Sequence, residues 1–346
     1  MTSGPNPPGP NPSGPNPPGP NPPGPGSPTA DLARLSTEAV RPELGDLDQL
    51  DAADLVALLS ADSRRATEAV AAAAPSLSAA VEVVCRRLAA GGRLIYVGAG
   101  SAGRLAMLDA AELGPTFNVA PGTVEAVLAG GENALRRPSE GAEDDWAAGV
   151  AALERLEVGE SDVVIGVSAS GRTPFVLGAI EHASSAGAAT VGMSCNAMSP
   201  LSTAGDIAVE LVVGGEVIAG SSRLNAGTAQ KIALNTISTA AMVRLGKTYG
   251  NLMVDVRPNN VKLRDRAVRI VQAITGAGPE VAASALGSAG WNVKLACLMA
   301  SSSQDLATVA PILEAAGGHL RQALDLVGRG AGEAPAGTLG SGRLAP

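Results

Sequence analysis

The sequence predicts an α/β protein, with a five-stranded parallel sheet flanked by helices and a small helical domain at the C-terminal end. Short apolar runs alternate with longer helical segments between residues 94 and 245, a pattern typical of βαβ units. The central runs, such as residues 163–167, are apolar on both faces, as in a parallel sheet covered by helices. After about residue 255 the strand pattern stops, and only short helical segments follow.

The strand candidates are short and rich in Val, Ile, Leu and small residues. They span residues 94–97, 124–128, 163–167, 190–193 and 207–213. The helices of this region are expected near residues 104–111, 143–156, 174–186 and 223–245. Pro174 supports the start of the helix at residues 174–186, because proline is favoured in the first helical turn. Ligands on such sheets bind beyond the carboxyl ends of the strands.

Further helices are expected on both sides of the sheet region. Before it, Ser76 is placed to cap the last of three helices, at residues 51–59, 63–74 and 76–90. After it, short helices are expected at residues 261–275, 279–286, 291–299, 304–315 and 319–326. Composition then divides the chain into a disordered Pro/Asn/Gly-rich tail (1–28), an α/β domain with N-terminal helices (31–255), a helical domain (256–327) and a disordered tail (328–346).

Composition and charge exclude several classes of protein. A formal net charge of -8 argues against nucleic-acid binding, which needs a basic face. Cys85, Cys195 and Cys297 are scattered, so we expect buried free thiols and no metal site. No apolar run reaches membrane-span length and no signal peptide opens the chain, so we expect a cytoplasmic protein without a membrane partner.

Two strand-to-helix loops carry groups suited to binding phosphate. The stretch Ser168-Ala169-Ser170-Gly171, followed by Thr173, combines hydroxyls with backbone N–H groups at a helix start. A plain strand-to-helix turn explains the same residues equally well. The earlier loop, residues 98–103, has the G-x-G-x-x-G spacing of dinucleotide sites, but Glu125 lies inside the next strand rather than at its end. The pair of loops therefore favours a phosphorylated small molecule.

Two glutamates stand out by position. Glu112 closes the helix after the first loop, and Glu143 lies in an acidic cluster at a helix start. Each is a candidate general acid or base. Each also has a structural explanation, since Glu112 suits a solvated helix end and acids such as Glu143 complement a helix dipole.

Several longer motifs point to one family. They are GGRLIYVGAG (91–100), AGGE (129–132), EGAEDD (140–145), SASGRTP (168–174), GSSRL (220–224), AGTAQK (226–231) and YGNLMVDV (249–256). In this order they resemble the N-acetylmuramic acid 6-phosphate etherases, over about residues 35–326. The resemblance implies the sugar isomerase (SIS) fold and a homodimer whose active site lies near the subunit interface.

The resemblance also implies a reaction. A carbon–oxygen lyase of this family converts N-acetylmuramic acid 6-phosphate and water into N-acetylglucosamine 6-phosphate and D-lactate, in peptidoglycan recycling, with no metal or organic cofactor. The open-chain aldehyde acidifies the proton on C2, a carboxylate removes it, lactate leaves C3, and water then adds. By motif, Glu112 is the implied proton donor and Glu143 the second acid/base residue.

The resemblance implies a set of substrate-binding residues, with the phosphate on the second hydroxyl loop. They are Ser101, Ser168, Ser170, Gly171, Thr173, Glu216, Ser221, Ser222 and Arg223. A loop carboxylate that bonds backbone N–H groups is an equal interpretation of Glu216, and a helix-start ion pair is the alternative for Arg223.

Two of the chain's departures from the usual pattern bear on substrate binding. Ala102 stands where the family usually has a hydroxyl residue, and Asn225 stands where it usually has Lys. These departures keep a second hypothesis open, a non-catalytic sugar-phosphate-binding regulator of the glucokinase regulatory protein type. An aldose–ketose isomerase and a transcriptional regulator are weaker alternatives.

Overall fold

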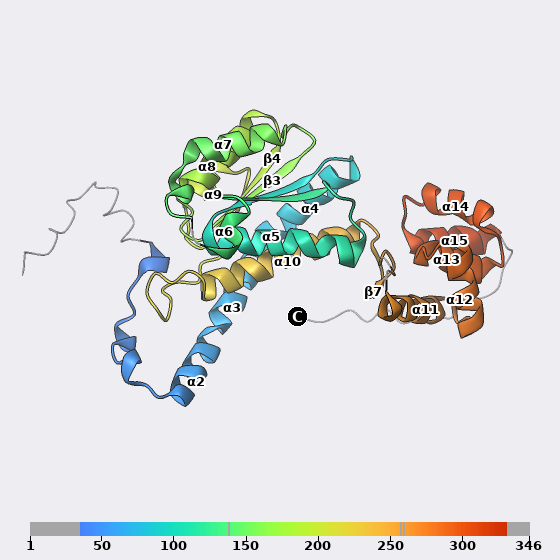
Figure 1. Ribbon diagram of the computed structural model, residues 1–346, viewed down its shortest axis with the longest axis horizontal. Coiled ribbons are helices and arrows are strands. Elements are labelled where there is room, and N and C mark those ends of the chain that lie inside the picture. The colour runs from blue at the N-terminus through green and yellow to red at the C-terminus, as the bar shows by residue number, and fades with distance from the viewer. Residues whose placement is uncertain (1–34, 138, 257, 259, 331–346) are drawn as a thin grey trace, which may run out of the picture.

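The protein consists of an α/β unit and a separate helical unit, which a short connection joins (Figure 1). The computed structural model describes residues 35–330 except 138, 257 and 259. The expected N-terminal tail, and residues 331–346 of the expected C-terminal tail, lie outside the described residues. The last helix, α15 (Leu320–Gly330), includes residues 328–330, so the helical unit extends three residues into the predicted tail.

The predicted parallel sheet is confirmed, in the order β2-β1-β3-β4-β5. Its strands are β1 (Leu94–Gly98), β2 (Val124–Leu128), β3 (Val163–Ser168), β4 (Ala189–Ser194) and β5 (Ile207–Glu210). The predicted extension of β5 to residue 213 is wrong. Its neighbour β4 ends at Ser194, so the ladder stops once the Leu211 N–H has donated to the Ser194 carbonyl at 2.8 Å.

Helices cover both faces of the sheet (Figure 1). One face carries α4 (Ala74–Ala89), α5 (Gly100–Phe117) and α10 (Asn225–Arg244), and the other carries α7 (Trp146–Arg155), α8 (Pro174–Ser185) and α9 (Pro200–Ala204). Two further helices, α2 (Ala52–Asp62) and α3 (Arg64–Ala72), precede them, and α6 (Asn133–Arg136) follows β2. The expected cap at Ser76 is wrong, because Ser76 lies inside α4 and its hydroxyl donates to the Ala73 carbonyl.

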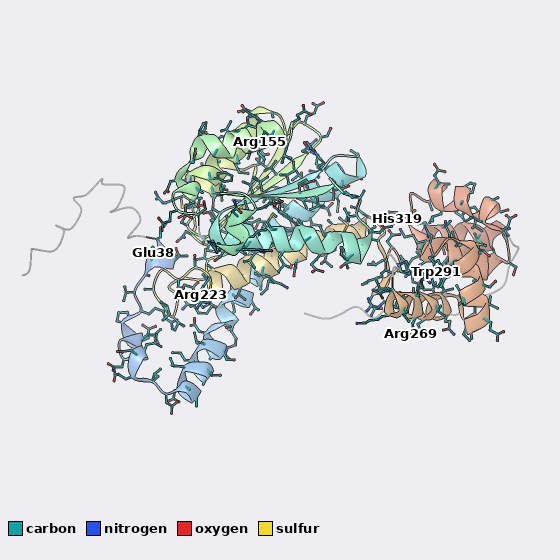
Figure 2. All side chains as sticks on the ribbon, in the orientation of Figure 1. Glu38, Arg155, Arg223, Arg269, Trp291 and His319 are labelled. Carbon is teal, nitrogen blue, oxygen red and sulfur yellow. The ribbon has the colours of Figure 1, made fainter. Side chains whose placement is uncertain are left out.

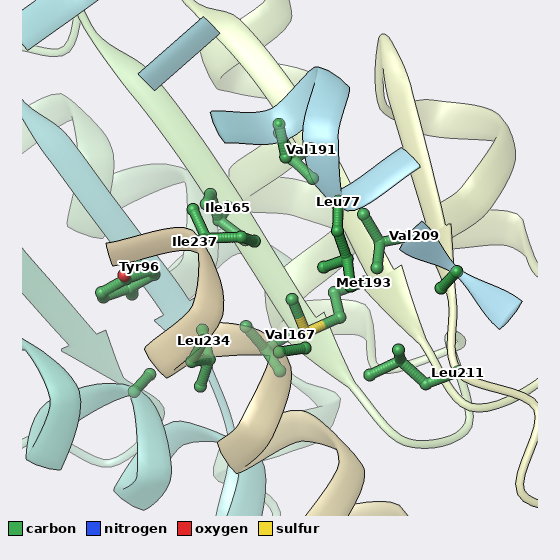
Figure 3. Packing of buried hydrophobic residues seen from close by; sticks show 14 of the residues in the cluster. Leu77, Tyr96, Ile165, Val167, Val191, Met193, Val209, Leu211, Leu234 and Ile237 are labelled. Carbon is green, nitrogen blue, oxygen red and sulfur yellow. The ribbon is translucent and has the colours of Figure 1, made fainter. Parts of the chain in front are cut away.

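Alternate residues of the strands fill two separate cores. In β1, Leu94 and Tyr96 pack towards α4 and α10, whereas Ile95 and Val97 pack towards α7 and α8. Figure 3 shows Leu234 and Ile237 of α10 among the strand residues of the first core. This period-two division accounts for strands that are apolar on both faces.

Glycine at position 98 allows α5 to begin directly above the end of β1. A Cβ at Gly98 would lie 2.6 Å from the Gly103 Cα and 2.7 Å from its nitrogen, both backbone atoms. We therefore expect Gly98→Ala to lower the free energy of unfolding by about 1–3 kcal/mol, measured by urea denaturation. The matched control is Gly114→Ala in the same helix, where the nearest atom to a new Cβ lies 4.0 Å away. An unchanged free energy of unfolding for Gly98→Ala would contradict this close approach.

The helical unit has its own core. It follows a hairpin of β6 (Thr248–Tyr249) and β7 (Leu252–Met253), which the sequence did not predict. Its helices are α11 (Val261–Thr275), α12 (Pro279–Ser288), α13 (Val293–Ser302), α14 (Leu306–Ala315) and α15. The buried Lys294 ammonium donates to Asp255 at 2.8 Å, which ties α13 to the connection after the hairpin.

The three cysteines are buried and free, and burial raises the pKa of Cys195 and of Cys297 to about 12.

Over the described residues, no single helix is long and apolar enough to span a membrane. Only Ala52–Ala72 and Ala74–Ala89, taken together as a pair bent by 60°, meet that test of length and composition.

Candidate active site

A cleft of about 360 Å³ lies at the carboxyl ends of β1 and β3. From β1 the chain goes to β2 on one side, whereas β3 lies on the other side of β1. The strand order therefore reverses between β1 and β3. Open α/β sheets bind ligands at such a point. The cleft is lined by Thr37, Glu38, Ala99, Gly100, Ser101, Ala102, Glu143, Asp144, Ser168, Ala169, Ser170, Arg172, Thr173, Pro174, Ser222 and Gln230.

The loop between β3 and α8 supplies a cluster of hydroxyls to this cleft. Ser168 Oγ lies 2.7 Å from Thr173 Oγ1 and 3.3 Å from Ser170 Oγ. The backbone N–H of Gly171 donates to Ser168 Oγ, and that of Arg172 donates to Ser170 Oγ. A hydroxyl oxygen that accepts from the backbone still has its own hydrogen to donate. The cluster can therefore present O–H donors to an anion.

The conformation of this loop depends on Gly171, which has a φ of +69°. A Cβ there would lie 2.2 Å from Ser199 Oγ, and the Gly171 carbonyl accepts from the Leu201 N–H at 3.0 Å. Gly171 itself does not line the cleft. The N–H groups of Gly171 and Arg172 donate to Ser168 and Ser170 and thereby hold these two hydroxyls in place.

Glu143 lies in the cleft, on a short 3-10 helix, η4 (Ala142–Asp144), beside Asp144. Both side chains are exposed. The next acid, Asp145, caps α7 by accepting from the Ala148 N–H at 2.8 Å. The helix therefore has its capping carboxylate without Glu143, and Glu143 is left available to a ligand.

One wall of the cleft comes from the N-terminal segment η1 (Ser36–Glu38), which sequence reasoning missed. Ser36 Oγ donates to Asn196 Oδ1 at 2.8 Å. Asn196 Nδ2 in turn donates to Thr37 Oγ1 and to the carbonyl of Ala169 in the β3–α8 loop. Glu38 adds a second glutamate to the cleft, on the side of the α/β unit where this segment meets it (Figure 2). No local signal marks these residues, because the contacts span about 160 positions.

Glu112 does not lie in this cleft. It is exposed on α5, eleven residues after Ser101, which corresponds to about 16 Å along a helix that rises about 1.5 Å per residue. One turn earlier, the buried Asp109 accepts from Tyr96 Oη at 2.8 Å and from Ser238 Oγ and Asn235 Nδ2. These bonds fix α5 against β1 and α10, so within one chain Glu112 and Glu143 are held apart.

Glu216 binds backbone N–H groups, which is the second of the two interpretations that its sequence position allows. It is 1% exposed, and its two oxygens accept from the N–H groups of Asn225 and Ala226 at 3.0 and 2.8 Å. The carboxylate thereby caps the start of α10. Glu216 does not line the cleft.

Asn225 also faces away from the cleft lining. Its Nδ2 donates to Asp62 Oδ2 at 2.6 Å, in a pocket where Asp62 already pairs with Arg41 at 2.6 Å and with Arg65 at 3.6 Å. Asn225, one of the two departures named from the sequence, therefore belongs to a buried ion-pair network. The other departure, Ala102, does line the cleft.

The remaining expected residues divide between the cleft and its neighbour. Ser101 and Ser222 line the cleft, whereas Ser221 and Arg223 do not. Arg223 lies in an adjacent hollow of about 410 Å³, which shares Ser101 with the cleft. That hollow is bordered by Ser101, Arg104, Leu105, Arg223, Gly227, Thr228 and Lys231. An anionic group that extends past Ser101 would thus meet three cations.

Taken together, the cleft combines hydroxyl donors at the end of β3 with carboxylates on η4 and η1. Such a site can hold a phosphorylated ligand and move protons on it. Across the described part of the chain, no group of three or more His, Cys, Asp or Glu side chains is arranged to hold a metal ion.

Comparison with known proteins agrees with this chemistry. Residues 76–184 match the family model described as "Glucokinase regulatory protein N-terminal SIS domain", and residues 149–240 match "SIS domain". The N-acetylmuramic acid 6-phosphate etherase of Rubrobacter xylanophilus is 57% identical over 77% of this chain and 88% of its own. That of Streptomyces avermitilis is 50% identical over 85% of this chain and 95% of its own.

Among solved structures, a phosphoheptose isomerase from Francisella tularensis aligns with 56% of this chain and 97% of its own, at 15% identity and a TM-score of 0.40. This likeness is too distant to bear on function. The relatives named as etherases, in contrast, cover most of both chains at high identity. The chain belongs to the N-acetylmuramic acid 6-phosphate etherase family and carries a SIS domain.

Proposed function

We propose that this protein is a carbon–oxygen lyase that cleaves the D-lactyl ether of N-acetylmuramic acid 6-phosphate. The products are N-acetylglucosamine 6-phosphate and D-lactate, and the cell would use the reaction to recycle peptidoglycan. The observation that carries the proposal is a single cleft that holds both a hydroxyl cluster for the phosphate and Glu143 for proton transfer. The identity to relatives with this name supports it.

In the proposed reaction, Ser168, Ser170 and Thr173 hold the phosphate on C6, with Ser101 beside them. A carboxylate removes the proton on C2 of the open-chain aldehyde. The C3–O bond breaks, lactate leaves with a proton from an acid, and an unsaturated aldehyde remains. Water then adds its hydroxyl to C3 and a proton returns to C2, so the atoms balance. Glu38 and Glu143 both line the cleft, and we assign the acid/base transfer at C2 and C3 to Glu143, which lies in the family motif EGAEDD.

We assign the second acid/base role to Glu112 of a partner subunit in a homodimer. An acid and a base that act on adjacent carbons of one sugar must both reach it, and within one chain Glu112 lies outside the cleft. On α5 the helix spacing places Glu112 one turn beyond Leu108, whose exposed fraction is 52%. An exposed face that carries both an apolar residue and a carboxylate is suited to bury against a second copy.

The exposed apolar residues of helix α2 support the same homodimer. In α2, Val56 is 68% exposed and Leu59 is 39% exposed, and Asp62 is the one buried residue of the helix. An apolar helix that its own chain leaves uncovered is stabilised when a partner covers it. The cytoplasmic location stays a prediction, and free buried thiols are compatible with a reducing compartment.

The regulator hypothesis draws on the match to the glucokinase regulatory protein domain. It predicts that the sugar phosphate binds without turnover. The identity to named etherases and the presence of Glu143 in the cleft favour the enzyme.

The test is to incubate the purified full chain with N-acetylmuramic acid 6-phosphate and to follow D-lactate with a lactate dehydrogenase assay. We expect stoichiometric release of D-lactate and N-acetylglucosamine 6-phosphate. Calorimetric binding of the same compound is measured in parallel. Binding without lactate would overturn the lyase in favour of the regulator, and a chain that neither binds nor turns over the compound would overturn both.

A further inference from the structure

A buried side chain in the cleft has an unused hydrogen-bond donor. Gln230 lies on α10, is 1% exposed, and lines the cleft together with Ser222 and Thr37. Within the described residues, its Nε2 has no hydrogen-bond partner. A buried amide N–H₂ without an acceptor costs free energy, and such groups are uncommon in folded proteins.

We propose that Gln230 Nε2 donates to the acetamido carbonyl oxygen of the bound sugar phosphate. This inference rests on the proposed function, because it names which part of that substrate Gln230 recognises. An acceptor atom of a ligand in the cleft would complete the hydrogen bonding of this donor. The free protein then bears the free-energy cost of the unpartnered donor, and binding of the ligand removes that cost.

The choice of acceptor follows from the other donors of the site. The phosphate has its own donors in the hydroxyls of Ser168, Ser170 and Thr173. The lactyl carboxylate is an anion, and the cations at Arg223 and Lys231 border the adjacent hollow. The acetamido carbonyl is the strongest neutral acceptor that remains, and a neutral amide donor from α10 matches it in charge. Because the acetamido group is carried on C2, this bond would also orient the carbon that loses its proton.

The test uses Gln230→Met, which keeps the length of the side chain and removes the donor. Two competitive inhibitors are compared in the lactate assay, N-acetylglucosamine 6-phosphate and glucose 6-phosphate, which has a hydroxyl at C2. We expect the inhibition constant of the first to rise about tenfold in the variant and that of the second to stay the same. The matched control is Gln272→Met on α11, outside the cleft, which should leave both constants unchanged.

Stability gives an independent readout. Removing an unpartnered buried donor should leave the melting temperature of the free protein unchanged or raise it, while the shift that N-acetylglucosamine 6-phosphate induces becomes smaller. A lower melting temperature of free Gln230→Met would show a structural partner and overturn the proposal. Equal weakening of both inhibitors would overturn the acetamido assignment, and no weakening would overturn substrate contact altogether.

These outcomes are separable from those of the proposed function. If the wild type binds N-acetylglucosamine 6-phosphate but releases no lactate, the lyase fails, and the inhibitor comparison is repeated as direct calorimetric binding. A selective loss in Gln230→Met would then still support the contact. If the wild type releases lactate and the variant behaves like Gln272→Met, the lyase stands and the contact fails.

Discussion

Replacing Glu143 by Gln lowers kcat for lactate release by about 10²–10⁴-fold, the range that a positioned acid/base group contributes. The amide keeps the shape of the side chain but can neither take nor give the proton. Since Glu143 is exposed and the capping role belongs to Asp145, the melting temperature should stay close to that of the wild type. Steady-state lactate assays and a thermal melt measure the two effects.

The control for this variant is Glu140→Gln, which removes one negative charge from the same acidic cluster at a position that does not line the cleft. Its kcat should remain within about twofold of the wild type, because Glu140 is exposed, does not line the cleft, and exposed charges contribute little through solvent. Equal losses in the two variants would show that net charge, and not proton transfer at Glu143, sets the rate.

Mixing two inactive variants restores activity if Glu112 acts across the subunit interface. Homodimers of Glu112→Gln and of Glu143→Gln each lack one group at both sites, and their lactate release should be near background. A heterodimer with one copy of each brings together an intact Glu143 and an intact Glu112 at one of its two sites. The purified heterodimer should therefore release lactate at roughly half the wild-type rate.

The measurement needs two different affinity tags on the C-terminal end, sequential purification, and a lactate assay on the doubly tagged species. Re-association of the separately tagged wild type provides the reference rate. A doubly tagged dimer that stays inactive would mean that Glu112 serves the site of its own chain, and an active Glu112→Gln homodimer would mean that Glu112 serves no site. A monomer in solution at the assay concentration would contradict the homodimer itself.

The sheet could be predicted closely because its signals are local. Runs such as residues 163–167 are apolar on both faces, and the helix that starts at Pro174 was predicted within one residue of its end. Errors arose where tertiary contacts decide the boundary. The strand β5 ends at Glu210 because β4 ends at Ser194, and α5 begins at Gly100 because Gly98 lets the helix approach the strand.

The site was only partly predictable for the same reason. Ser168, Ser170 and Thr173 belong to one loop, and their clustering follows from the local turn. Thr37 reaches the cleft through contacts between distant parts of the chain, and no short pattern marks it. Gln230 lies in the AGTAQK motif, but its place in the cleft depends on how α10 packs against the sheet. Glu216 was placed in the right region, but its role depends on where α10 begins, since its oxygens accept from the Asn225 and Ala226 N–H groups.

The attachment of Ser36 and Thr37 to Asn196 has a consequence for how the protein becomes active. During synthesis these residues leave the ribosome about 160 positions before their partner, so the N-terminal wall of the cleft can close only after β4 has formed. Once the sheet has folded, only a few hydrogen bonds to Asn196 hold this segment in place. Mild denaturant should therefore release this wall before the sheet unfolds, and substrate affinity should disappear while the circular dichroism of the sheet is still native.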